Sequence, residues 1–149
     1  MLGYRRLSIP SKVVALLLTT GTLILASANA VSTNPLTLDT DNGAVRIKIT
    51  QDPPTVELKQ PVKFTLDFLD PISNNSKSHV NYDFSIVDAQ QNKISEITGL
   101  HTHEGHDIES TTFDIPGNYT LSVDVKGTGL NQPFDTSYSG LVTTNIVIP

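Results

Sequence analysis

Apolar and polar residues alternate along most of the chain, and no useful stretch after residue 42 has a helical period. In one clear case Val45, Ile47 and Ile49 alternate with Arg46 and Lys48. Such alternation predicts β-strands with one face toward a core and one toward water. The same pattern recurs and predicts seven short strands, at residues 45–49, 62–68, 80–86, 93–100, 111–115, 119–125 and 142–148.

Short strands separated by loops at regular spacing predict two antiparallel sheets packed face to face. A local motif narrows the class, because Pro116-Gly117 forms a turn signal and Tyr119 then enters an alternating strand. In immunoglobulin-like domains a Tyr at this place bonds through its hydroxyl to nearby backbone, as a tyrosine corner. We therefore expect an all-β fold, an immunoglobulin-like antiparallel β-sandwich of about seven strands over residues 43–149.

The N-terminal 30 residues have the pattern of a secretory signal peptide. Three basic residues come first, namely Arg5, Arg6 and Lys12. An apolar run follows at residues 13–26, and Ala28-Asn29-Ala30 is a small-x-small cleavage site. The run is shorter than the roughly 20 residues of a spanning helix, so we expect cleavage, with an uncleaved membrane segment as the alternative. Residues 31–42 are polar and turn-rich, which predicts a flexible leader.

Charge and composition exclude several classes of function. The chain has 149 residues, 10 basic and 15 acidic, and removal of the signal leaves seven basic residues and a net charge of −8. This acidity disfavours nucleic acid and anionic membrane surfaces as partners. The absence of Cys excludes thiolate nucleophiles, disulfides and thiolate metal sites within this chain, including blue copper. We expect an acidic protein that is secreted or otherwise extracytoplasmic.

Histidine is the one residue type that is clustered. Three of the four lie within six residues, as His101, His103 and His106, with Glu104 and Asp107 among them. Imidazole is a common ligand for Cu(II), Zn and Ni(II). Alternate positions of an extended segment face one side, so the first two rings could reach one ion. A turn at the intervening glycine could return the third, and the carboxylates could bind the ion or orient the rings.

The fourth histidine, His79, precedes the third predicted strand, and its role depends on the register of the following hairpin. A pairing of Ile86 with Ile94 puts His79 opposite His101, on the face away from the core. A two-residue turn shifts the register by one and sends the two histidines to opposite faces. The apolar pattern fits both registers, which a bulge near Glu96 would reconcile.

These residues predict a metal site, with a solvated loop as the alternative interpretation. The Irving–Williams order places copper before zinc for a nitrogen site of this kind. We expect metal capture or delivery and no enzymatic turnover, because no general base or nucleophile motif is evident. The expected partners are a metal ion and another exported copper protein. A structural or adhesive surface module without metal is the alternative function.

Four segments carry a resemblance to a known group of proteins. They are residues 79–84 (HVNYDF), 100–105 (LHTHEG), 116–120 (PGNYT) and 127–134 (GTGLNQPF). From His79 onward the chain resembles small exported immunoglobulin-like sandwich domains of ammonia-oxidising archaea. That resemblance implies the sandwich fold and export, and a copper role by way of copper-dependent respiration. The chain is more loosely similar to bacterial exported copper-handling sandwich modules, but it lacks their Met-rich ligands.

Overall fold

The computed structural model describes residues 34–149, so the predicted signal peptide and residues 31–33 lie outside the described part. Within it, no helix is long and apolar enough to cross a membrane. The elements are β1 (Leu36–Asp39), β2 (Arg46–Asp52), β3 (Pro61–Leu69), β4 (Val80–Asp88), β5 (Lys93–Thr102), β6 (His106–Thr112), β7 (Gly117–Thr128), the 3-10 helix η1 (Thr136–Tyr138) and β8 (Gly140–Ile148).

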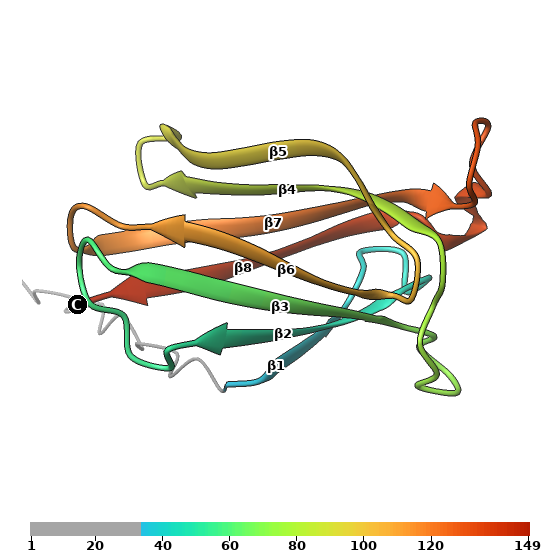
Figure 1. Ribbon diagram of the computed structural model, residues 1–149, viewed down its shortest axis with the longest axis horizontal. Helices are drawn as coiled ribbons and strands as arrows, with labels where there is room; N and C mark the ends of the chain where they lie inside the picture. Colours follow the sequence, from blue (N-terminus) through green and yellow to red (C-terminus); the bar gives the residue numbers. More distant parts are fainter. Residues whose placement is uncertain (1–33) are drawn as a thin grey trace, which may run out of the picture. The chain divides into compact units, whose positions relative to one another are not determined.

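The strands form two four-stranded sheets with the orders β1-β2-β3-β6 and β5-β4-β7-β8. Every pair of neighbours is antiparallel. The chain crosses between the sheets at β3–β4, β5–β6 and β6–β7, and the sheets lie as two layers (Figure 1). This arrangement confirms the predicted fold class, an immunoglobulin-like antiparallel β-sandwich.

The core lies between the two layers, where the alternating apolar residues of both sheets meet. Phe68 of β3 packs against Tyr82 of β4 with ring centroids 4.8 Å apart, and Phe64 lies 6.1 Å from Phe84 in the same way. All four rings are fully buried or nearly so. Burial of each such ring contributes on the order of 2–3 kcal/mol. These contacts fix β4 against β3 and so fix the position of the residue that precedes β4.

The tyrosine corner is present as predicted. The Tyr119 hydroxyl donates to the carbonyl oxygen of Ile115 at 2.7 Å. The Tyr119 ring is buried and lies 4.8 Å, centroid to centroid, from the ring of Phe113. The corner therefore anchors the β6–β7 crossing to the core.

The prediction of a flexible leader over residues 31–42 is wrong for residues 36–39. Residues 36–39 form β1, which pairs with β2 from Leu36↔Ile49 to Asp39↔Arg46. Residues 34–149 therefore contain eight strands, and the sandwich begins before residue 43. Two apolar residues separated by Thr37 are too few to show a period against the polar residues around them.

The fifth predicted strand, residues 111–115, begins too late. The corresponding strand is β6, which starts at His106. Its inward positions include Asp107 and Glu109, and both carboxylates lie within hydrogen-bond distance of the buried Tyr82 hydroxyl, at 2.9 and 3.0 Å. Polar residues therefore point inward here while Ile108 is exposed. That reversal hides the strand from a pattern that assumes apolar residues inside.

Candidate metal centre

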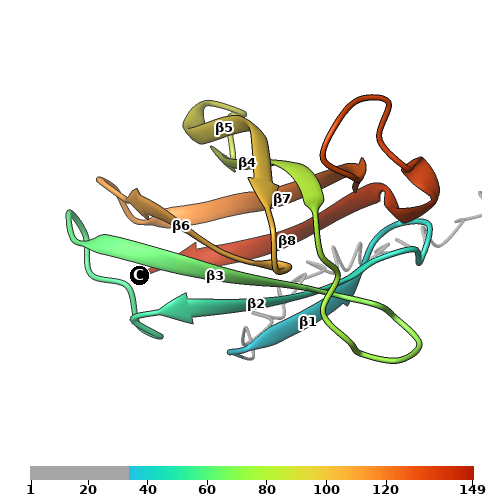
Figure 2. The same cartoon turned by 45° about the vertical axis from the view of Figure 1, so that its right-hand side comes forward.

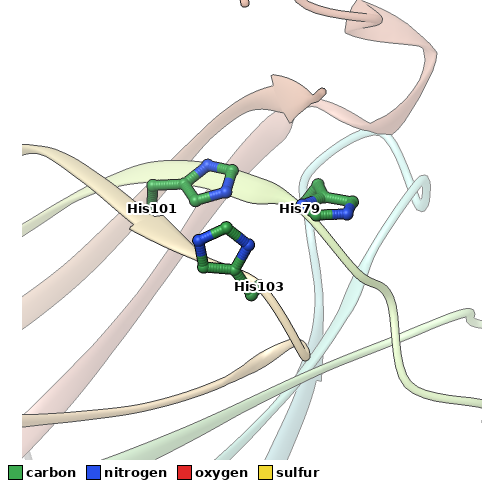
Figure 3. A group of neighbouring side chains, drawn as sticks. All are labelled: His79, His101 and His103. Carbon is green, nitrogen blue, oxygen red and sulfur yellow. The ribbon is translucent and has the colours of Figure 1, made fainter. Parts of the chain in front are cut away.

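Three histidines from two separated parts of the chain meet at one end of the sandwich. His79 precedes β4, His101 lies near the end of β5, and His103 follows β5. The rings are turned toward one another (Figure 3), with centroids 5.7, 5.3 and 4.8 Å apart. One nitrogen from each ring lies within 4.8 Å of the others. Among the His, Asp and Glu side chains of residues 34–149, these three form the group whose potential ligand atoms lie close enough together to hold one metal ion.

The β4–β5 pairing explains how His79 reaches the predicted face. The register shifts by one residue twice, between Ile86 and Val87 and between Tyr82 and Phe84. Two one-residue shifts restore the original face, because side chains alternate with a period of two. They also place His79 opposite His103, not His101, and the two shifts lie on either side of Glu96. Of the two registers left open by the sequence, the one that puts His79 and His101 on the same face gives the observed face, but the residue opposite His79 is His103 and not His101.

The backbone of His79 is held in an uncommon conformation. Its φ is +55°, in the left-handed region where His is one of the enriched non-glycine residues. Its N–H donates to the carbonyl oxygen of His103 at 3.2 Å, and its own carbonyl accepts from the N–H of Gly129 at 2.8 Å. The backbone of His79 is therefore hydrogen-bonded both to the β5–β6 turn and to the β7–β8 connection. In Figures 1 and 2 both segments lie at the end of the sandwich where β4 begins.

Gly105 permits the close approach of the two segments that carry His79 and His103. A Cβ at this position would lie 2.1 Å from the carbonyl oxygen of Lys77, two residues before His79. Gly105 also has φ +73°. Its carbonyl accepts from the N–H of Phe68 at 2.8 Å, which ties the turn to β3. A side chain here would push the backbone of the β3–β4 loop away from the β5–β6 turn.

Asn81 determines which nitrogen of His101 is free. Its Nδ2 donates to the carbonyl oxygens of Gly129 at 2.8 Å and His79 at 3.4 Å. Since carbonyl oxygens only accept, the amide oxygen of Asn81 must face His101, where it lies 2.9 Å from Nδ1. His101 therefore carries its proton on Nδ1 and donates it to Asn81. The lone pair remains on Nε2, the nitrogen that a metal ion would bind.

Two nitrogens of the triad are buried without a hydrogen-bond partner. They are Nδ1 of His79 and Nε2 of His101, judged against residues 34–149. A buried acceptor left unpaired costs about 1–3 kcal/mol. Burial, followed by repulsion from His103 and His79, lowers the pKa of His101. The lowered pKa favours the neutral ring of His101, which is the form that ligates a metal. The two unpaired nitrogens would each gain a partner by binding an ion.

The triad offers a three-nitrogen ligand set with further coordination positions open. Nitrogens bound to one ion at about 2.0–2.1 Å lie about 3.4 Å apart in tetrahedral geometry. The present nitrogens lie within 4.8 Å, so binding needs a contraction of about 1.4 Å or less. His103 is the exposed member of the three and can supply this motion by turning its side chain. The residues present thus fit a metal ion bound by imidazole.

The other three predicted ligands lie elsewhere. The ring of His106 projects from β6 to Asp67, with Nδ1 2.7 Å from Oδ1, so the glycine turn does not return it to the triad. Asp107 faces the core and Tyr82. Glu104 is exposed in the turn, where its carbonyl oxygen accepts from the Ser76 hydroxyl. Strand β6 begins at residue 106 and alternates, so its first two side chains point outward and inward, away from a common site.

The sequence analysis did not identify Asn81, and it gave Gly105 the role of a turn that returns His106, whereas the structure uses Gly105 for the close approach to Lys77. Asn81 stands two positions after His79, and the alternation of a strand would have placed it on the face of the histidines. Comparison with known proteins adds no family, since no protein-family model and no curated protein matches the chain.

Proposed function

We propose that this chain is an exported copper(II)-binding protein that captures or delivers the ion through His79, His101 and His103. The observation that carries the proposal is the pair of buried, unpartnered imidazole nitrogens beside a third, exposed ring. A solvated loop without metal would leave these nitrogens exposed to water, because burying them without a hydrogen-bond partner is costly. A bound ion satisfies both.

Copper is favoured over zinc by the order of affinities, because among divalent first-row metals the affinity for a nitrogen site rises to a maximum at Cu(II). The three imidazoles differ from the closed four-ligand set of a structural zinc site. The copper in this proposal is cargo, and its entry and departure require the open positions that three ligands leave.

Export rests on the N-terminal pattern of residues 1–30. In this proposal the protein acts outside the cytoplasm, and its partner is another exported copper protein that gives or receives the ion. The acidic net charge of the exported part favours attraction of cations to its surface.

Calorimetric titration of the purified protein with Cu(II) and Zn(II) tests the proposal. The variants are His101→Ala, which removes a ligand, and His106→Ala, which removes an exposed histidine outside the triad. We expect one Cu(II) per chain, weaker binding of Zn(II), and a loss of affinity of more than about 100-fold in His101→Ala, since removal of a ligand costs more than removal of a group that only orients a ligand. His106→Ala should bind as the unaltered protein does. Electron paramagnetic resonance of the Cu(II) complex should report nitrogen ligands.

Two results would refute this function. Copper binding no tighter than that of a disordered histidine-containing peptide would exclude the site and leave the surface-module alternative. Equal losses in His101→Ala and His106→Ala would show that copper binds the surface without selecting the triad.

A further inference from the structure

The four strands at the sheet edges differ in their protection against pairing with another chain. Edge strands are commonly prevented from pairing with another chain by short length, charged side chains, bulges or inward-pointing charges. β1 has four residues and ends at charged Asp39. β5 carries Lys93, Glu96 and two register shifts, and β6 turns Asp107 and Glu109 inward. β8 has none of these devices, since its nine residues contain no charge and no proline and pair with β7 without a shift.

The hydrogen-bond pattern identifies the open positions of β8. The N–H and C=O of Leu141 are bonded to Asp41 of the β1–β2 turn, at 3.0 and 2.9 Å. These groups therefore point away from β7, and in an antiparallel ladder every second residue does the same. The outward residues that follow are Thr143, Asn145 and Val147. Within residues 34–149, no backbone partner for their six outward groups is present.

The open segment of β8 is complementary to itself. Antiparallel pairing of two copies about a two-fold axis at Asn145 sets Asn145 opposite its counterpart and Thr143 opposite Val147. All six outward groups of each copy are then bonded, and no other register uses all three open positions. The inward residues Val142 and Ile148 come opposite each other, so the apolar face continues from one copy to the next. No charge is buried, although the whole chain is acidic.

From these observations we propose that β8 is a dimerisation surface, and that its partner is β8 of a second copy. Pairing joins two four-stranded sheets into one of eight strands. The contact involves one strand edge and is smaller than the roughly 800 Å² per partner of a standard interface. The dimer is therefore expected to be reversible, with a dissociation constant in the micromolar range or weaker. This proposal goes beyond metal binding and does not depend on it.

The pairing of Asn145 with its own counterpart permits a register-specific test. Sedimentation equilibrium is measured over a concentration series in EDTA, so that the outcome is independent of metal binding. Asn145→Lys and Asn145→Asp each place like charges opposite each other across the axis, and each should raise the dissociation constant about tenfold or more. An equimolar mixture of the two variants should form a heterodimer, because opposite charges then face each other.

The matched control is Ser122→Lys, which adds the same charge to the same sheet on the interior strand β7 and should leave dimerisation unchanged. Thermal melts of each variant establish that the fold is retained. A protein that stays monomeric up to millimolar concentration overturns the proposal. So does a dimer whose dissociation constant is unchanged by Asn145→Lys, or failure of the mixed variants to associate.

Discussion

The close contact at Gly105 supports a quantitative prediction about how the site is built. Replacement by Ala adds one methyl group at a position where φ is +73° and where the added Cβ would lie 2.1 Å from the Lys77 carbonyl oxygen. Gly43 is a matched control, since its φ is +71° and a Cβ there would meet no atom within 4 Å. The two substitutions share the backbone strain and differ only in the clash.

The strain common to both variants is about 1–2 kcal/mol, the cost of a left-handed conformation for Ala. The added Cβ would also lie 2.6 Å from the Ser76 hydroxyl oxygen, but rotation of that side chain leaves the clash with the Lys77 backbone in place. Relief to an ordinary contact needs a separation of about 1 Å or more, and such overpacking costs about 1–3 kcal/mol. Gly105→Ala should therefore destabilise the fold by about 1–3 kcal/mol more than Gly43→Ala.

The same separation acts on the metal site, because Lys77 lies two residues before His79. It lengthens the 3.2 Å bond between the His79 N–H and the His103 carbonyl oxygen. We expect Gly105→Ala to weaken Cu(II) binding about tenfold or more, while Gly43→Ala leaves it unchanged. Urea unfolding in EDTA measures the stability difference, and copper titration measures the affinity. Equal destabilisation by the two variants, or unaltered affinity in Gly105→Ala, would refute the reasoning.

Two further predictions concern polar groups around the core. Asn81→Ala should lower Cu(II) affinity about 10–100-fold and remove the Nδ1–H preference of His101, which ¹⁵N NMR of the metal-free protein reports; an unchanged tautomer would contradict the assigned role. Burial raises the pKa of Glu109 above its ordinary 4.5, and repulsion from Asp107 adds to this. The unfolded chain therefore loses the Glu109 proton at a lower pH than the native fold does. As a result, the native fold loses stability as pH rises from 4.5 through the raised folded-state pKa. Glutamine does not titrate, so Glu109→Gln lacks this pH-dependent loss of stability, and its melting temperature relative to the unaltered protein should rise over that pH range. A difference in melting temperature that does not vary with pH would exclude the effect.

The strands of the fold could be predicted wherever alternation reflects burial. Val62, Phe64, Leu66 and Phe68 alternate with polar residues because one face of β3 packs in the core. β6 could not be placed correctly, because Glu109 points inward and Ile108 outward. The alternation pattern assigns the buried face of a strand from its apolar residues. A strand with inward carboxylates is therefore assigned the wrong buried face or is not recognised as a strand.

The histidine triad could be predicted in part, for a reason of the same kind. Residue types and spacing brought His101 and His103 together, because neighbours in a strand have fixed directions. His79 is held near them by two register shifts and a left-handed backbone. The conflict between the two apolar registers indicated a bulge near Glu96 but not two shifts, and the backbone conformation of His79 has no dependable signature in one sequence. His106 was included because a glycine turn can reverse a chain, but the turn instead leads directly into β6. Local chemistry was predictable, and the path of the backbone between elements was not.

The three ligands of the proposed site are held unequally, and this bears on capture and release. His101 is locked by Asn81, and His79 is gripped by backbone bonds to His103 and Gly129, whereas the His103 ring is exposed. Preorganised ligands lose little freedom on binding and favour capture. An exposed ligand can be displaced by a competing group of a partner protein without disturbing the core. Structural metal sites close the coordination sphere with a fourth protein ligand. Here one ligand is exposed and a position is left open, which favours the exchange of the ion that the proposed function requires.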